Sequence, residues 1–368
     1  MSAQGPATRL TIRGVRTTAV EVPMTFALGT SAAIIRAAPL LLIELDTDEG
    51  VTGRTYLFCY RRSGARAIAD LLHDAVELVK GERAAPVDVG ALLSRRFALI
   101  GVTGVARMAL SGLDAALWDA AAMAAGVPLA RLLGAEPKPI PVYNSNGLGL
   151  MAPEAAADEA QKLCEGGFGA VKLRLGYATL DDDLAAARAV RRALPDGVAL
   201  MADYNQALSR AEALRRGRAL DDEGLYWVEE PIRHDDYAGH AALTDELTLP
   251  IQIGENFNGP DAMAQALAVQ ACDLVMPDLA RIGGVTGWMQ AAGVAAAHGI
   301  PMSSHLFPEV SCHLLAASPT RHWLEYVDWA NAIIEEPLRI ENGQAAVADR
   351  PGSGLTWNDK AVQRYALA

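Results

Sequence analysis

Short apolar segments alternate with amphipathic helical patterns along most of the chain after Pro139. The helical patterns cover residues 154–165, 182–194, 210–221, 261–271 and 285–298. The apolar segments are four to six residues long and have the character of strands, at 141–145, 170–175, 199–204, 225–229, 251–255, 274–278, 302–305 and 323–327. Such alternation is typical of βα units around a parallel sheet. Eight units, with no dinucleotide-binding glycine fingerprint after the first strand, predict an α/β fold, a modified TIM-like (β/α) barrel, rather than an open sheet.

The pattern at the two ends of the chain differs from that of the barrel. Residues 11–22 and 40–57 are strand-like and are separated by an irregular loop. Helical patterns follow at 65–80 and 87–99 and from about Gly104. We expect an N-terminal α+β capping domain over residues 1–136, a barrel over 137–336, and a C-terminal segment, 337–368, of short strands and turns that returns to the capping domain.

Composition fits this division into a barrel and a capping domain, and it excludes several classes of binding partner. The chain has 368 residues, 51% of them hydrophobic, which is enough for a large barrel core and a smaller second domain. Its net charge of −12 provides no basic stripe for nucleic acid. No apolar run has membrane-spanning length, and the first twelve residues lack the features of a signal peptide, so we expect a cytoplasmic protein without membrane contact. The four widely spaced cysteines are expected to be free, mostly buried thiols.

Acidic residues stand at the ends of three successive predicted strands. Asp203, Glu229 and Glu255 are each separated by 26 positions, about one βα unit. In a barrel, the carboxyl ends of the strands meet at one face, so three carboxylates should lie side by side there. A hard divalent cation, best Mg²⁺, would relieve their repulsion. The alternative is that each carboxylate pairs with a nearby arginine or lysine.

Two cations precede these acids. Lys172 and Arg174 are two positions apart on one strand and therefore point to the same side, into the barrel. Beside a metal, they would bind and polarise a substrate carboxylate and stabilise the enediolate that forms when the α-proton leaves. Alternatively, Arg174 is an ion-pair partner of a ligand carboxylate.

The ends of the sixth, seventh and eighth strands supply acid–base groups. Asp278 and His305 lie at neighbouring strand ends, where a carboxylate can orient an imidazole and raise its basicity. Glu325, on the last strand, is a candidate for a protonated carboxyl that donates to the developing oxyanion. A plain ion pair with a barrel cation explains Glu325 equally well.

Four motifs carry a resemblance to the mandelate racemase/muconate lactonizing enzyme family of the enolase superfamily, and the resemblance covers nearly the whole chain. They are Met-Ala-Asp-Tyr-Asn-Gln at 201–206, Trp-Val-Glu-Glu-Pro at 227–231, Gly-Gly-Val-Thr-Gly-Trp at 283–288 and Pro-Met-Ser-Ser-His-Leu-Phe at 301–307. The resemblance implies a barrel enzyme that abstracts an α-proton in a symmetric homo-oligomer, commonly an octamer.

The resemblance also implies a role for individual residues. Three acids correspond to the Mg²⁺ ligands: Asp203, Glu229 and Glu255. His305 with Asp278 corresponds to the base for one enantiomer, Glu325 to the acid that stabilises the enolate, and Lys172 to a contact with the substrate carboxylate. Residues that match positions near the substrate are Ser145, Asn205 and, on the capping domain, Tyr56.

Arg174 departs from the family pattern, which has a second lysine there as the opposite base. A guanidinium is a poor proton acceptor because its pKa exceeds 12. Either the site lowers the pKa of Arg174, or His305 is the only base and also serves as an acid. The second outcome predicts a dehydratase of an acid sugar rather than a racemase or epimerase of a 2-hydroxy carboxylate.

The segment that matches the flap over the substrate favours the racemase. It is apolar, with one charged exception at Arg36, whereas a polyhydroxy acid requires hydrogen-bonding groups. Its apolar residues are Phe26, Ala27, Leu28, Ala32, Ala33, Ile34 and Ile35. We therefore expect a small hydrophobic or aromatic 2-hydroxy acid. A catalytically silent barrel that binds a carboxylate is the alternative from a different functional class.

Overall fold

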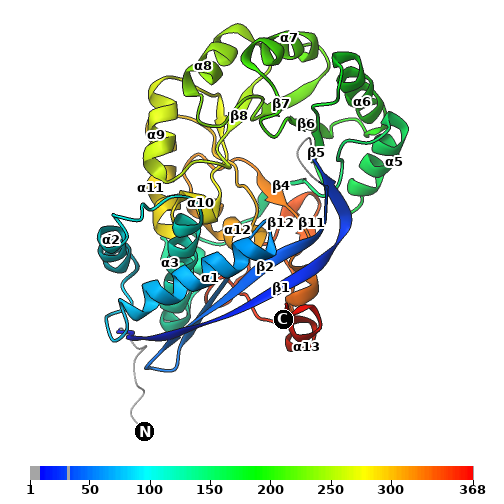
Figure 1. The fold of residues 1–368 in the computed structure, drawn as a ribbon. Coiled ribbons are helices and arrows are strands. Elements are labelled where there is room, and N and C mark those ends of the chain that lie inside the picture. The colour runs from blue at the N-terminus through cyan, green and yellow to red at the C-terminus, as the bar shows by residue number, and fades with distance from the viewer. Residues whose placement is uncertain (1–8, 31–33, 368) are drawn as a thin grey trace.

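The computed structural model describes residues 9–30 and 34–367. Its N-terminal part is an antiparallel sheet of β1 (Ile12–Gly29), β2 (Ile34–Thr47) and β3 (Thr52–Phe58), in that order. Four helices follow: α1 (Arg62–Glu77), α2 (Pro86–Arg96), α3 (Gly104–Ala125) and α4 (Leu129–Leu132). The apolar face of β2 is buried against α1 and α3, which makes this capping domain a two-layer α+β structure (Figure 1).

The capping sheet differs from the sequence expectation in two places. The strand-like stretch 40–57 is two strands, because the chain turns at Gly50, where φ is +80° and the amide donates to the Thr47 carbonyl. The expected irregular loop after residue 22 is instead a long hairpin, since β1 continues to Gly29 and β2 begins at Ile34. Within the predicted flap, Ala32 and Ala33 lie outside the described residues.

The barrel is built from parallel segments in the predicted order. From β4 to β9 each strand pairs with the next along the chain, and β10 pairs with β4. The strands are β4 (Ile140–Asn144), β5 (Ala170–Arg174), β6 (Ala199–Asp203), β7 (Leu225–Glu229), β8 (Ile251–Ile253), β9 (Leu274–Val275) and β10 (Leu324–Tyr326). Between β9 and β10, residues 302–305 are extended but make only isolated bridges, such as Asp278 with His305. The predicted (β/α) barrel is confirmed.

Helices form the outer ring of the barrel (Figure 1). They are α5 (Pro153–Leu163), α6 (Leu180–Ala193), α7 (Arg210–Leu220), α8 (Tyr237–Glu246), α9 (Pro260–Ala268), α10 (Leu279–Ile282), α11 (Gly284–His298) and α12 (Pro308–Ala317). Their buried faces and the apolar strands form one continuous core with the capping domain. None of the helices in the described ranges has the length and apolar composition that crossing a membrane requires.

The C-terminal tail connects the barrel to the capping domain. After η1 (Asn331–Ile333), the hairpin of β11 (Ile340–Glu341) and β12 (Gln344–Ala345) pairs antiparallel with β4. The chain then reaches the capping sheet, where α13 (Asp359–Tyr365) contacts β1 and Ala366 bridges to Val20. The tail therefore returns to the capping domain, as the sequence predicts.

Candidate active site

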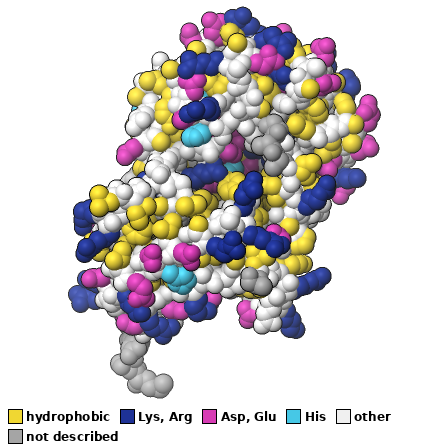
Figure 2. Space-filling model, in the orientation of Figure 1, with side chains coloured by type: hydrophobic (Ala, Val, Ile, Leu, Met, Phe, Trp, Pro, Cys, Tyr) yellow, Lys and Arg dark blue, Asp and Glu magenta, His cyan; other side chains and the backbone are white. Residues whose placement is uncertain are grey.

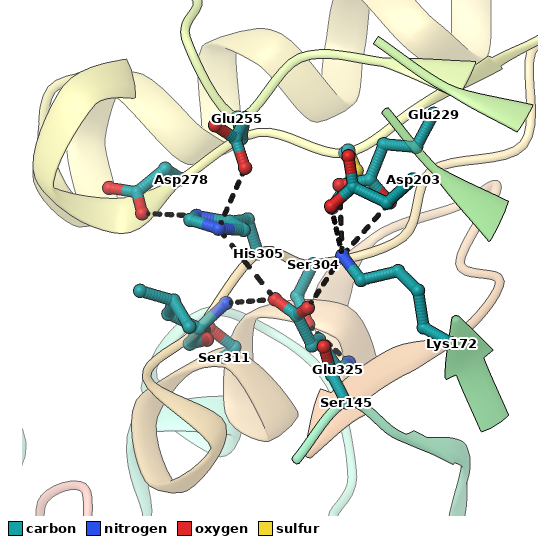
Figure 3. A network of polar contacts seen from close by, with 12 residues as sticks. Ser145, Lys172, Asp203, Glu229, Glu255, Asp278, Ser304, His305, Ser311 and Glu325 are labelled. Carbon is teal, nitrogen blue, oxygen red and sulfur yellow. Dashed lines mark hydrogen bonds and ion pairs between the residues drawn. The ribbon is translucent and has the colours of Figure 1, made fainter. Parts of the chain in front are cut away.

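The three strand-end acids meet at the carboxyl end of the barrel. Asp203 and Glu229 are the last residues of β6 and β7 and face each other in register, and Glu255 follows β8 by two residues. Figure 3 shows the three carboxylates gathered around one site. The spacing of one acid per βα unit therefore produces the cluster that the sequence predicts.

Lys172, on β5, lies against two of these acids, Asp203 and Glu229, and against Glu325. Its ammonium lies 2.9 Å from Glu229, 2.9 Å from Glu325 and 3.5 Å from Asp203 (Figure 3). Burial alone would lower the pKa of Lys172, but the surrounding carboxylates raise it well above its ordinary value. Lys172 is therefore a fixed positive charge within the acidic cluster.

The cluster still contains more carboxylates than Lys172 can balance. Burial and the neighbouring charge of Asp203 raise the pKa of Glu229 well above its ordinary value, despite Lys172. Across residues 9–30 and 34–367, no group of three or more acidic, histidine or cysteine side chains is arranged so that it could hold a metal ion. Lys172 separates the carboxylates here, yet their oxygen atoms are the ligands that a hard divalent cation prefers. That Asp203, Glu229 and Glu255 hold such a cation therefore stays a prediction.

His305 lies between two carboxylates. Its Nδ1 is 2.6 Å from Asp278 Oδ2, and its Nε2 is 3.1 Å from Glu255 Oε2. Asp278 itself is held by the amides of Ala280 and Arg281, which donate to its other oxygen. Burial alone would lower the pKa of His305, but Glu255, Glu325 and Asp278 raise it well above its ordinary value. The predicted dyad forms, and its imidazole is oriented by a fixed carboxylate.

Glu325 forms an ion pair. Its oxygens lie 2.9 Å from Lys172 Nζ and 3.9 Å from His305 Nε2, and one accepts a hydrogen bond from the Leu306 amide. Burial alone would raise its pKa, but Lys172 and His305 hold the pKa at about 2. In this arrangement Glu325 is an ionised acceptor, which contrasts with the protonated donor suggested from the sequence and matches the ion-pair alternative.

Arg174 points into the loop that follows β4. Its Nη1 donates to the carbonyls of Ser145 and Gly147, each at 2.9 Å, and its Nη2 donates to the Ser145 hydroxyl. The Ser145 hydroxyl in turn donates to Glu325. All of these acceptors of Arg174 are neutral oxygens, and the roles expected from the sequence for Arg174, as a substrate-binding cation, a base or an ion-pair partner, stay predictions. The Arg174 Nε is buried without a partner in the described part of the chain, so one donor remains available to a bound oxygen.

The remaining two predicted substrate contacts lie at different places. Asn205, in a left-handed conformation with φ of +45°, donates from its side chain to Asp203 and therefore supports a cluster acid directly. Tyr56, on β3, donates to Glu309 on α12 at 2.6 Å and packs against Phe307. Neither of these contacts is with the acidic cluster, so the place of Tyr56 near the substrate stays a prediction.

Two residues that were not candidates in the sequence, Arg281 and Asn256, contact Glu255. Arg281, on α10, donates to the Glu255 carbonyl at 2.9 Å and to Asn256 at 2.6 Å, and it also contacts the Tyr60 ring and hydroxyl. Asn256 donates to Glu255 and Glu230. The available signal was the position of Arg281 three residues after Asp278, within the short helix α10.

The site lies in a hollow between the barrel and the capping sheet. Figure 2 shows this hollow, with acidic and basic side chains inside and hydrophobic side chains along the capping side. Aromatic rings from β3 and the segment after it meet the barrel here, as in the Phe58–Trp329 pair, whose ring centroids are 4.9 Å apart. A ligand in the hollow would therefore touch charged groups below and apolar groups above.

Several known proteins are similar to this chain over most of its length. The chain is 34% identical over 329 residues, 88% of this chain and 81% of its relative, to L-talarate/galactarate dehydratase of Salmonella typhimurium. It matches a Bradyrhizobium enolase, crystallised with magnesium and mandelic acid, at 42% identity and a TM-score of 0.94, over 98% of this chain and 100% of that one. L-Talarate dehydratase of Polaromonas sp. JS666, complexed with Mg and L-glucarate, matches at 29% identity and a TM-score of 0.89, over 98% of each chain.

Two family models divide the chain between them. The N-terminal domain of mandelate racemase/muconate lactonizing enzymes matches residues 10–134, and the enolase C-terminal domain-like family matches residues 155–361. The second match alone spans more than half of the sequence. This chain belongs to the mandelate racemase/muconate lactonizing enzyme family of the enolase superfamily.

Proposed function

We propose that this chain is a Mg²⁺-dependent enzyme that removes the α-proton of a 2-hydroxy carboxylate, with His305 as the base. The observation that carries the proposal is the 2.6 Å contact between His305 Nδ1 and Asp278, which fixes the tautomer and the orientation of the ring. The other ring nitrogen, Nε2, then faces the acidic cluster, where it can accept a proton when the ring is neutral.

The proposed Mg²⁺ ligands are Asp203, Glu229 and Glu255. Their oxygen atoms and their excess negative charge suit the ion, and magnesium is present in the Bradyrhizobium and Polaromonas structures. When bound, the ion supplies positive charge that lowers the pKa of the substrate α-proton and offsets the repulsion among the carboxylates. Lys172 adds a second fixed charge, at which the substrate carboxylate can bind.

Among the reactions that begin with this step, the contacts of Arg174 favour dehydration of an acid sugar. The guanidinium is engaged with the Ser145 and Gly147 carbonyls, and as a proton acceptor it is poor in any case. His305 is then the only base. It takes the α-proton, the electron pair forms the Cα–Cβ double bond, the β-hydroxyl leaves, and the imidazolium proton goes to it to give water. The enol product becomes a 2-keto acid.

Racemisation or epimerisation is the second candidate. The Bradyrhizobium neighbour contains mandelic acid, which has no β-hydroxyl to expel, and the hairpin residues Phe26 and Leu28 place apolar side chains on the capping side. This route requires a proton donor on the face opposite His305. A catalytically silent barrel that binds a carboxylate would carry out neither reaction.

The product formed in D₂O separates these reactions. The chain, with Mg²⁺, is incubated separately with galactarate, L-talarate and each enantiomer of mandelate, and the products are followed by proton NMR. We expect a 2-keto acid from a sugar diacid. An inverted, α-deuterated substrate without keto acid would overturn dehydration in favour of racemisation. The absence of both products and of α-deuterium exchange for every compound bound would overturn the enzymatic proposal.

A further inference from the structure

The guanidinium of Arg174 holds a single loop, residues 145–149, which we call the seat loop. Three of its hydrogen bonds end there: two on the carbonyls of Ser145 and Gly147 and one on the Ser145 hydroxyl. The backbone amide of Arg174 adds a fourth, to the carbonyl of Leu148 at 2.9 Å. One residue of β5 thus holds the seat loop through the carbonyls of Ser145, Gly147 and Leu148.

The seat loop needs these contacts because its backbone is strained. Gly147 and Leu148 are both left-handed, with φ of +59° and +45°. This conformation costs a leucine on the order of 1 kcal/mol or more unless surrounding contacts enforce it. Leu148 is completely buried, and its amide donates to Glu159 on α5. Arg174 and Glu159 together hold the loop from both sides.

The end of β1, at Gly29, rests on the seat loop. The amide of Leu150, directly after the loop, donates to the Gly29 carbonyl at 3.3 Å. A Cβ atom at Gly149 would lie 2.6 Å from the Gly29 carbonyl oxygen and 2.7 Å from its Cα and nitrogen. A Cβ atom added at Gly147 would lie 3.0 Å from the Cβ of Phe26. Figure 1 shows β1 and β2 reaching the barrel beside β5.

We propose that Arg174 is a positioning residue, which fixes the seat loop as the support for the hairpin end and thereby sets where Phe26 and Leu28 stand over the substrate. This inference rests on the proposed function, because it assigns the hairpin to the substrate side of the site. Arginine suits the task since its planar fork donates to several acceptors at once, whereas a lysine has one nitrogen. The residue at the family's second-lysine position thus acts on substrate fit through the loop.

Two variants test the inference from opposite sides of the contact. Arg174→Lys weakens the support without touching the hairpin, and Gly149→Ala pushes the hairpin away without touching Arg174. In hydrogen–deuterium exchange without substrate, we expect peptides covering residues 24–29 and 145–151 to exchange about tenfold faster in each, a change of about 1.4 kcal/mol. With substrate, KM should rise by a similar factor while kcat changes little.

Arg191→Lys is the matched control. Arg191, on α6, also donates to loop carbonyls, those of Val198 and Pro195, but it lies away from the hairpin and the acidic cluster. We expect wild-type exchange in both peptides and an unchanged KM. The double variant Arg174→Lys/Gly149→Ala should not raise the exchange rate or KM above the values of the more severe single variant, because both substitutions disrupt the same contact.

Three results would overturn the inference. Unchanged exchange of residues 24–29 in Arg174→Lys would show that the loop does not support the hairpin. Fully additive effects on KM would show that Arg174 contacts substrate directly, through its free Nε. A loss of kcat in Arg174→Lys without faster exchange would show that Arg174 takes part in the reaction itself. The exchange measurement needs no substrate, so its result is valid even if the proposed reaction is wrong. An inactive wild-type protein would show separately that the proposed reaction is wrong.

Discussion

Tyr56 and Glu309 form a buried contact between β3 and α12, in which the hydroxyl donates to the carboxylate at 2.6 Å. Burial raises the pKa of Glu309 to about 6, although the Tyr56 hydrogen bond lowers it. Tyr56→Phe leaves the carboxylate without this donor, so we expect a loss of about 1–3 kcal/mol in the free energy of unfolding at pH 7. Urea denaturation measures the loss, and KM should remain near the wild-type value.

Glu309→Gln serves as the control for this substitution, since its amide oxygen still accepts from Tyr56 and no charge is buried. It should be destabilised less than Tyr56→Phe. A wild-type unfolding free energy together with a large rise in KM for Tyr56→Phe would instead place the hydroxyl on the substrate, as the family resemblance implies.

At the residue scale, the sequence predicted the members of the acidic cluster but not all their contacts. Asp203, Glu229 and Glu255 follow from the period of the βα units, because parallel strands end at one face of a barrel. The contacts of Arg174 depend on the left-handed backbone at 147 and 148, which no hydrophobic pattern encodes. Arg281 was missed because a four-residue helix after β9 leaves no periodic signal.

At the element scale, Asp114 joins α3 of the capping domain to the start of α11. Its carboxylate accepts hydrogen bonds from the amide and hydroxyl of Thr286. Burial raises its pKa from 3.8 to about 7. Between these values the folded protein binds more protons here than the unfolded chain does, so the contribution of Asp114 to the free energy of unfolding falls as pH rises through that range.

Asp114→Asn removes this titration. The difference in unfolding free energy, variant minus wild type, should increase by a few kcal/mol as pH rises from 4 to 7.5. Urea denaturation at each pH measures this difference. The exposed Asp88 of α2 provides the control, since Asp88→Asn should leave the pH profile unchanged. A profile for Asp114→Asn parallel to that of wild type would contradict the assignment.

Element boundaries were predicted best where a short apolar run lies between two helical patterns. The barrel strands near residues 141, 170, 199 and 225 lie where expected, because each is a short apolar run flanked by helical patterns. The run at 302–305 is extended but makes only isolated bridges, since its hydrogen bonds to both neighbours are interrupted. The hairpin continuation of β1 was missed because Pro23 and a register shift interrupt its alternating pattern.

At the scale of the whole molecule, an ion that binds only the folded protein stabilises it. Mg²⁺ at one hundred times its dissociation constant should add about 2.7 kcal/mol to the free energy of unfolding, seen as a rise in Tm in a thermal shift assay. Glu255→Gln removes a proposed ligand and should lose most of that rise. Glu246→Gln, on the outer helix α8, is the control and should keep it.

An equal rise in Tm for wild type and Glu255→Gln would show that Mg²⁺ binds elsewhere. Chelator added to the wild type should reverse the rise, because the ion is exchangeable between site and solution.

The central claim is that His305 removes the α-proton. The most direct test is the rate at which a bound 2-hydroxy acid exchanges its α-hydrogen in D₂O with Mg²⁺ present, compared between wild type, His305→Asn and His298→Asn. His298 is exposed at the end of α11 and is the control. We predict that His305→Asn lowers the exchange rate by about 10²–10⁴-fold, the usual contribution of a general base, while His298→Asn exchanges at the wild-type rate. Wild-type exchange in a folded, Mg²⁺-binding His305→Asn protein would contradict the account.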